Sequence, residues 1–314
     1  MIDAPVTRVH LAGKPSRSPH GGLDSRATGR PGWGSTGLEI DRTPEREPPM
    51  AHRPLRPLSP AADAVRVYDA WLDELGERLA DPSCDRDALC VEILRDLFFP
   101  GLPTDADPDD LSPAVRVALA NLDPRNVTLE PEYYHEIDVE RYYPRKPLIW
   151  LWQMFDRSPL GGNVHLGVRF RRLLAPHVFQ RVGENFKCFH FAEVSFGYNL
   201  EVGDNVVIHR NVLLDDRGGI VLGNNVSVSD HAAVFSHTHS IDDIADVTNL
   251  KTVLEDNVRI TYGATVLAGV HVGKQGMVGA KALATRDVRP YHVNVGIPAK
   301  SVRVKSIAPP EARG

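Results

Sequence analysis

The sequence has little cysteine and no long apolar run. Its three cysteines, Cys84, Cys90 and Cys188, are an odd number without the spacing of metal ligands, which predicts a reducing compartment and neither a structural disulfide nor a zinc site. The longest unbroken apolar run, Pro147 to Trp152, is far shorter than the roughly 20 residues of a membrane span. The N-terminus lacks the apolar core segment of a signal peptide, so no signal peptide is predicted. These absences predict a cytoplasmic protein without a membrane span.

A run of basic residues is also missing. The chain has no Lys/Arg-rich segment and a formal net charge of −5, so nucleic acid is not an expected partner. The net charge favours no other class of partner. With 314 residues and 42% hydrophobic content, the chain can bury a sizeable core and is expected to hold two folded units.

The first 58 residues differ in composition from the rest. They are dense in Gly, Pro, Ser and Arg, as in GGLDSRATGRPGWGSTG, and have no hydrophobic periodicity, which predicts disorder. Met50 stands just before the change in character, and we hypothesise that the functional chain starts there. At the other end, residues 306–314 are expected to form a flexible tail.

Residues 59–180 are expected to be mostly helical. The predicted helices cover residues 60–79, 89–97, 113–122 and 169–182. Ser59-Pro60 and Ser112-Pro113 are expected to cap the first and third, because serine caps a helix well and proline fits its first turn. The aromatic stretch YYHEIDVERYYPRKPLIWLW is expected to pack on the structure that follows it. The alternative is that it helps to form an acceptor pocket, since Tyr and Trp stack on sugar-like rings.

The strongest pattern lies in VLEDNVRITYGATVLAGVHVGKQGMVGAKALAT, which starts at Val253. Apolar residues recur at positions 254, 260, 266, 272, 278 and 284, and an apolar residue or glycine stands four positions after each. On an α-helix a six-residue step turns by about 240°, so these side chains would share no face. A single strand of this length would far exceed the usual length of strands. The pattern predicts a coil with three short strands per turn, parallel pairing between turns and one shared apolar core.

The same period occurs upstream. It runs through positions 202, 208 and 214, slips by two residues at 215–219, and resumes at 222, 228 and 234. A larger interruption, from about Phe235 to Thr252, separates this block from the next. Insertions in a solenoid emerge as loops, often on the binding face, so this interruption is expected to carry chemistry.

Two histidines, His237 and His239 in FSHTHSIDD, stand at the start of the interruption. Alternate residues of an extended segment point to the same side, so both imidazoles are expected to face one cleft. Histidine suits proton transfer near neutral pH, and the pair is interpreted as a general base with its neighbour. Metal ligation, with His209 or His231 as a third ligand, and a merely structural pair are the alternatives.

Three segments together resemble the maltose/galactoside O-acetyltransferase family of hexapeptide acyltransferases. They are VGENFKCFHFAEVSFGYNLEVGDNVVIHRNVLLDD, GGIVLGNNVSVSDHAAVFSHTHS and a last segment that ends in GIPAKSVR, and the match covers roughly residues 181–304. The resemblance implies a mainly β protein with a left-handed parallel β-helix, the hexapeptide-repeat solenoid, over residues 181–305. It also implies a homotrimer with active sites between subunits. The implied reaction moves an acetyl group from acetyl-CoA to a hydroxyl of a saccharide or sugar-bearing molecule, without a metal.

The resemblance assigns roles to single residues as well. It places the catalytic base on His239, whose THS is similar to the family's [TG]HP, while His237 has no firm counterpart and is expected beside the acceptor. Ser195, His209 and Asp216 fall on positions that contact the acceptor. The positions that hold CoA are Tyr262, Ala280, Thr285, Arg286, Lys300 and Arg303. The three cations among them, placed where the solenoid ends, suit contact with phosphate.

The sequence departs from the family pattern at several positions. The family's N-x-N is His209-Arg210-Asn211 here, and its V-W-I-G is Val258-Arg259-Ile260-Thr261. Tyr262 occupies a position that is normally small and lines the CoA channel. The family's N-terminal segment, which supplies an acidic acceptor contact, has no recognisable match in residues 59–160. The acceptor is therefore less well determined than the chemistry.

The predicted mechanism is direct transfer. Neutral His239 takes the proton of the acceptor hydroxyl while its oxygen attacks the thioester, and no serine or cysteine elbow suggests an acyl-enzyme. An amine acceptor is an alternative, since a neutral histidine can deprotonate either nucleophile. Two rival functions are a catalytically silent scaffold in which Tyr262 blocks the channel, and a γ-carbonic-anhydrase-like zinc enzyme on the same solenoid.

Overall fold

The structure is a computed structural model that describes residues 59–243 and 246–313. These residues belong to one compact unit, Pro57–Gly314. The predicted disorder of residues 1–58 and the hypothesis of a start at Met50 fall outside the described residues.

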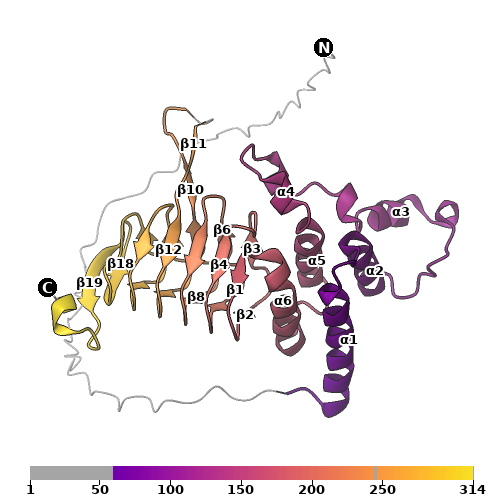
Figure 1. Ribbon diagram of the computed structural model, residues 1–314, viewed down its shortest axis with the longest axis horizontal. Helices are drawn as coiled ribbons and strands as arrows, with labels where there is room; N and C mark the ends of the chain where they lie inside the picture. Colours follow the sequence, from indigo (N-terminus) through magenta and orange to yellow (C-terminus); the bar gives the residue numbers. More distant parts are fainter. Residues whose placement is uncertain (1–58, 244–245, 314) are drawn as a thin grey trace, which may run out of the picture. The chain divides into compact units, whose positions relative to one another are not determined.

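A group of helices precedes a β-solenoid (Figure 1). The helical elements are α1 (Ala62–Ala80), α2 (Arg86–Phe98), η1 (Pro108–Asp110), α3 (Pro113–Ala120), η2 (Pro124–Asn126), η3 (Glu130–Tyr133), α4 (Val139–Tyr142), α5 (Lys146–Arg157) and α6 (Val164–Val178). The α5 and α6 helices contribute fully buried Leu148, Phe155 and Phe170 to a core that continues into the solenoid.

The two Ser-Pro caps have different outcomes. Ser112 caps α3 as predicted, because its Oγ accepts the backbone N–H of Val115 (3.4 Å) and Pro113 fills the first helical position. The prediction for Ser59-Pro60 is wrong, since α1 begins at Ala62 without a side-chain cap. Ala61 there keeps φ −55° and ψ 145°, an extended backbone, so the first helical turn forms only after it.

The helix that leads into the repeats also differs from its predicted bounds. It begins earlier, where Asn163 caps it by accepting the N–H of Leu166 (3.1 Å), and it ends at Val178. The end comes four residues before the prediction because Arg181 and Val182 already pair with the next coil as β1. Before it, the aromatic stretch packs on the first coils as expected, with Tyr142 against Phe196 at a ring distance of 6.5 Å.

The chain from Arg181 to Val304 builds a parallel solenoid with three faces. The first face holds β1 (Arg181–Val182), β4 (Leu200–Val202), β7 (Ile220–Leu222), β12 (Thr252–Leu254) and β15 (His271–Val272). The second face holds β2 (Lys187–Cys188), β5 (Val207–Ile208), β8 (Ser227–Val228), β13 (Arg259–Ile260), β16 (Met277–Val278), β18 (His292–Val295) and the antiparallel β19 (Lys300–Val304). The third face holds β3 (Glu193–Val194), β6 (Leu213–Asp215), β9 (Ala233–Phe235), β14 (Thr265–Val266) and β17 (Leu283–Ala284).

The six-residue period is the spacing between faces. Leu254, Ile260 and Val266 lie on three successive faces, all fully buried, and Leu254 then pairs with Val272 one turn later. Each period therefore delivers one aliphatic side chain to the same core. The fold class predicted from the repeats is confirmed.

Asparagines form one column of corners between the first two faces. Asn185, Asn205, Asn225 and Asn257 all have positive φ, from 54° to 62°. Asparagine tolerates this left-handed backbone better than other residues with a side chain. Asn185 also donates its amide N–H to Asn205 Oδ1 (2.9 Å), so neighbouring corners are linked.

Stacked glycines let these corners approach closely. A Cβ on Gly203 would lie 2.8 Å from the carbonyl carbon of Gly223 in the next coil. We expect Gly203→Ala to lower the free energy of unfolding by about 2 kcal/mol, because the contact is with backbone and the coils must shift. Urea denaturation measures this. Gly162→Ala is the matched control, since its Cβ would meet nothing within 4 Å, and an equal effect of the two substitutions would contradict the packing argument.

The corner between the third and first faces holds extra residues in three successive coils. Val182 pairs with Val202 and Val202 with Leu222, so the first turns take 20 residues, whereas the turn from Leu254 to Val272 takes 18. The slip noted in the sequence at 215–219 therefore has an equivalent one coil earlier, at 195–199. The interruption is the third extension, and its strands β10 (His237–His239) and β11 (Val247–Asn249) project from the solenoid as an antiparallel hairpin (Figure 1).

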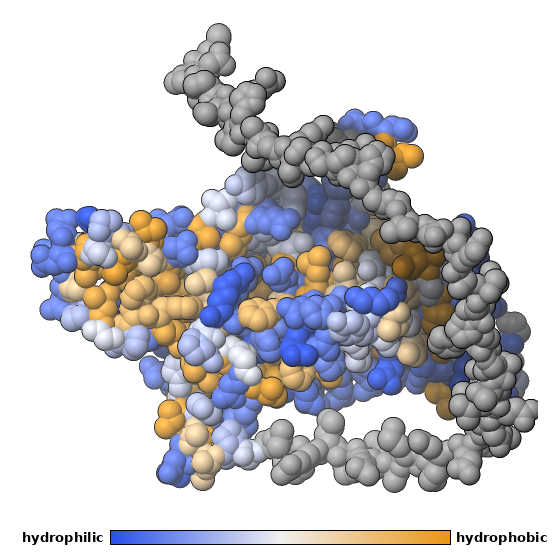
Figure 2. Space-filling view, turned by 180° about the vertical axis from the view of Figure 1, so that it is seen from behind, coloured by the Kyte–Doolittle hydropathy of each residue, from blue (hydrophilic) through white to orange (hydrophobic). Residues whose placement is uncertain are grey.

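Residues 310–313, within the predicted flexible tail, form a short helix, η4 (Pro310–Arg313). Exposed apolar side chains of the helical region include Val67, Val117 and Tyr133, and Figure 2 shows apolar residues gathered over the helical end of one face. Among the described residues, no helix is both long and apolar enough to pass through a membrane.

Candidate active site

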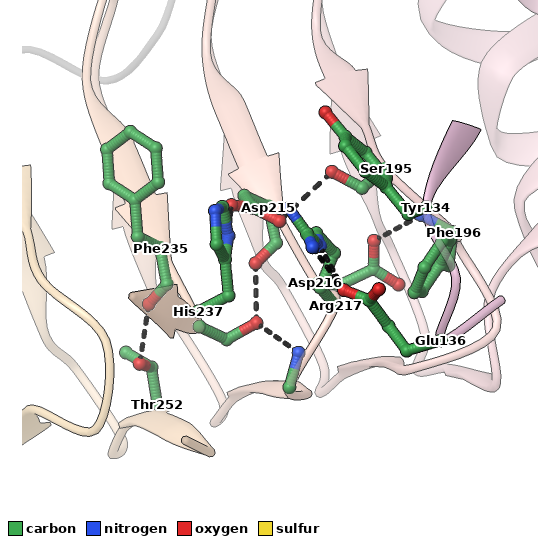
Figure 3. Close-up of polar contacts among 12 residues, drawn as sticks. Tyr134, Glu136, Ser195, Phe196, Asp215, Asp216, Arg217, Phe235, His237 and Thr252 are labelled. Atoms are coloured by element: carbon green, nitrogen blue, oxygen red, sulfur yellow. Dashed lines mark hydrogen bonds and ion pairs between the residues drawn. The ribbon is translucent and has the colours of Figure 1, made fainter. Parts of the chain in front are cut away.

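The extended corner brings polar residues of three coils together (Figure 3). Ser195 follows β3, Asp215 ends β6 and His237 begins the hairpin after β9. Because the coils pair in parallel, Glu193 lies opposite Leu213 and Asp215 opposite Phe235. The three coils thus place successive polar side chains along one edge of the solenoid.

Asp215 and His237 form the central contact of this site. The Nδ1 of His237 touches Asp215 Oδ2, with side-chain exposures of 16% and 5%. Nδ1 lacks the alignment of a hydrogen bond, so we describe the pair as a short electrostatic contact. Asp215 Oδ1 accepts the hydroxyl hydrogen of Ser195 (3.1 Å). A carboxylate that holds one ring nitrogen leaves the other nitrogen of the imidazole for proton transfer.

Buried hydroxyl groups fix the backbone around this pair. Ser236 is fully buried, donates its hydroxyl to the carbonyl of Asp215 (2.5 Å) and accepts the N–H of Gly218 (2.8 Å). Thr252 donates to the carbonyl of Phe235 (2.7 Å), where the hairpin rejoins the solenoid. Both ends of the insertion are therefore tied to the rigid coils, which limits the movement of His237.

Asp216 points the other way, into the protein. It is fully buried, and its carboxylate accepts the N–H groups of Phe196 (2.7 Å) and Asn199 (3.1 Å). Burial raises the pKa of Asp216 to about 6, although its backbone hydrogen bonds oppose the rise. Its carboxylate thereby holds the 195–199 corner of the preceding coil in place.

Arg217 connects the site to the helical region. Its guanidinium donates to Glu136 Oε1 through Nε (2.7 Å) and makes a second, shorter contact through a terminal nitrogen. It also lies 3.8 Å from the centre of the Tyr134 ring, within the range of cation–π attraction. Burial raises the pKa of Glu136, but its own backbone N–H, Arg217 and His237 together lower it below the ordinary value. The region before α4 thus contributes an aromatic ring and a carboxylate to the corner.

The structure brings the side chains of Ser195, His237 and His239 together at this corner. Asp216 belongs to the same corner, but its buried carboxylate accepts backbone N–H groups of the preceding coil. The rings of His237 and His239 lie 5.2 Å apart, and His239 is exposed on the hairpin. His209 stands at a different corner, where it stacks on Phe189 at 5.2 Å. The predicted roles of these residues stay predictions.

The residues predicted to hold CoA lie further along the solenoid. Tyr262 and Ala280 occupy one corner in neighbouring coils. The backbone N–H of Lys281 donates to the Tyr262 carbonyl (2.9 Å), and the Lys281 ammonium lies 5.0 Å from the centre of the Tyr262 ring. Thr285 and Arg286 are exposed and follow β17 at the same edge as His237. The remaining two, Lys300 and Arg303, are exposed on β19.

Sequence reasoning did not single out Asp215, Arg217, Glu136 or Tyr134. The slip at 215–219 was the available signal, because a break in the repeat that carries two carboxylates and an arginine marks a corner outside the apolar core. Glu136 and Tyr134 gave no such signal, since a contact across about 80 positions of sequence leaves no periodic trace. Within 59–243 and 246–313, no three His, Cys, Asp or Glu side chains converge as metal ligands.

Known proteins with similar sequences are acetyltransferases. A galactoside O-acetyltransferase of Lactococcus lactis is 31% identical over 134 residues, which cover 40% of this chain and 63% of that protein. A protein named as an acetyltransferase from Schizosaccharomyces pombe is 33% identical over 112 residues, 34% of this chain and 54% of that protein. A solved maltose O-acetyltransferase from Clostridium difficile 630 is 22% identical, with a TM-score of 0.48, over 55% of this chain and 91% of that chain.

These sequence matches confirm the family resemblance. The repeat region is similar in sequence to two galactoside O-acetyltransferases, at 31% and 26% identity. The chain spans only about half the length of the first curated relatives that it matches, 54% and 57% of two yeast proteins. No family model matches the chain.

Proposed function

We propose that this protein is an acetyl-CoA-dependent O-acetyltransferase that acts on a hydroxyl of a saccharide or sugar-bearing molecule. The observation that carries this proposal is the Asp215–His237 contact at the extended corner. The relationship to O-acetyltransferases supports the type of reaction. A homotrimer with sites between subunits and a cytoplasmic location are further parts of the proposal that derive from the resemblance and the composition.

The proposed base is one of the two paired histidines. The resemblance assigns it to His239, and the structure offers His237, which has the buried carboxylate of Asp215 against its Nδ1. We therefore propose His237 as the base, with His239 beside it at the acceptor. Neutral His237 accepts the hydroxyl proton on Nε2 as the acceptor oxygen attacks the thioester carbon. The C–S bond then breaks, and the imidazolium returns the proton to the leaving thiolate.

The edge of the solenoid offers a path for the donor. This corner exposes Leu250, where the hairpin rejoins the solenoid, and Leu267 in the next coil, at 42% and 37%. Thr285 and Arg286 follow one coil later. An extended thioester arm running along this edge would meet apolar side chains first and a cation later, which matches an apolar chain that ends in phosphates. This arrangement supports acetyl-CoA as the donor.

Calorimetric titration with acetyl-CoA tests the donor site. We expect Arg286→Ala to weaken acetyl-CoA binding about tenfold, because a charge-assisted contact with phosphate contributes about 1.4 kcal/mol or more. Lys274→Ala is the matched control, since it removes an exposed cation from another corner and should leave the affinity unchanged. A folded wild-type protein that does not bind acetyl-CoA would refute the transferase and favour a silent scaffold.

A further inference from the structure

A pocket lies between the helical region and the first coils of the solenoid. Glu130 and Tyr134 from η3 and the residue after it, Gln153 from α5, and Glu193 and Ser195 from β3 and its corner all line it. Ser195 belongs to both the pocket and the active site, because its hydroxyl donates to Asp215 (3.1 Å). Figure 3 shows Tyr134 and Ser195 on the other side of Asp215 from His237. The pocket therefore reaches Asp215, the carboxylate that contacts the proposed base.

The wall of this pocket is fixed in place. Tyr134 packs its ring against the buried guanidinium of Arg217, which is in turn paired with Glu136. The phenol donates to Glu130, and burial together with this hydrogen bond raises the pKa of Tyr134 to about 12, so the phenol keeps its proton at neutral pH. A preorganised wall of an aromatic ring, a hydroxyl and an amide is suited to a polyhydroxylated ligand.

The charged groups of the pocket have one sign. Glu130 and Glu193 are its ionisable acidic residues, and neither has an ion-pair partner in the part of the chain that the structure describes. Arg217, the cation that lies against the Tyr134 ring, already shares its charge with Glu136. An anionic ligand would be repelled here, and an ammonium group would be attracted.

The strand order sets the length of the ligand. Glu193 on β3 lies opposite Leu213 on β6, and Asp215 on β6 lies opposite Phe235 on β9. Two strand spacings, about 10 Å, thus separate the coil of Glu193 from the coil that leads into His237. A molecule that binds at Glu193 and presents a hydroxyl to His237 must be longer than one sugar ring.

We infer that the acceptor is an elongated polyol with an amino group, which Glu193 and Glu130 bind while a distant hydroxyl reaches His237. This inference rests on the proposed function and adds the chemical class of the acceptor. The amino group serves recognition, and the hydroxyl near His237 receives the acetyl group.

Calorimetry with three matched disaccharides tests the inference. The probes are the β-1,4 dimer of glucosamine, cellobiose as its neutral analogue, and cellobiouronic acid as the anionic one, titrated into the full chain at low salt. We expect the glucosamine dimer to bind most tightly and the uronic acid most weakly. Glu193→Gln should weaken binding of the glucosamine dimer roughly fivefold, the size expected for the loss of an exposed ion pair. It should leave the affinity for cellobiose unchanged. Glu184→Gln, which changes an exposed carboxylate at another corner, should alter neither.

Equal affinity for the three disaccharides would overturn the inference, as would absence of binding or an amine preference that Glu193→Gln does not reduce. Titration of the same samples with acetyl-CoA separates this failure from failure of the proposed function. A protein that binds acetyl-CoA but prefers the neutral or anionic probe refutes only the acceptor class. A protein that prefers the amine but does not bind acetyl-CoA refutes the proposed transferase function and supports an amine-binding pocket.

Discussion

His237→Ala is expected to lower kcat for acetyl transfer by about 10²- to 10⁴-fold, because it removes the proposed base, which Asp215 contacts. The KM for acetyl-CoA should change little, since the proposed donor path runs along the coils that follow the hairpin. Steady-state release of free CoA, measured with a disaccharide acceptor, gives both constants. The affinity for acetyl-CoA, measured separately, shows that the variant is folded.

Two other histidines serve as comparisons for this result. His239→Ala should lower kcat less, by about tenfold, because His239 is exposed on the hairpin and is proposed to act beside the base. His271→Ala should have no effect on kcat, although His271 also contacts a carboxylate, Glu255 (2.8 Å), on the outer surface of another face. A larger loss for His239→Ala than for His237→Ala would assign the base as the family resemblance does.

Asp216→Ala is expected to have the largest effect on stability. The substitution leaves several buried backbone N–H groups of the 195–199 corner without an acceptor, and each costs about 1–3 kcal/mol. We expect the free energy of unfolding to fall by about 4 kcal/mol in urea denaturation at fixed protein concentration. Asp242→Ala, which removes an exposed carboxylate from the hairpin, should change it by less than about 0.5 kcal/mol.

The pH dependence of stability gives a second test of Asp216. Because burial raises its pKa to about 6 in the folded protein, above the ordinary 3.8, the folded state binds the proton more tightly than the unfolded state. The stability that this proton contributes is full below about pH 4 and is lost as the pH rises through about 6. The stability difference between wild type and Asp216→Asn should therefore decline by about 3 kcal/mol over that range. A constant difference would show that Asp216 is ionised in the folded protein throughout.

The hexapeptide period was enough to predict the solenoid. A step of six residues with an apolar side chain at Leu254, Ile260 and Val266 fits only a chain that turns a corner every six residues, and these side chains are fully buried on three faces. The bounds of α1 and α6 were less well predicted. A short-range signal such as Ser59-Pro60 does not show that the next residue will be extended and not helical, as Ala61 is. Nor does the local sequence show that Arg181 and Val182 will pair with another coil.

The sequence by itself determined the repeat, its interruption and the histidines at the interruption, because each is a local pattern that a parallel solenoid repeats along its axis. Only the tertiary structure decided that the Asp215 carboxylate faces His237 while that of Asp216 accepts backbone N–H groups of the 195–199 corner, because both contacts join residues of different coils. It also decided that Tyr134 and Glu136 join the same corner through Arg217. Such contacts depend on how the helical region packs on the first coils, and no spacing in the sequence encodes that packing.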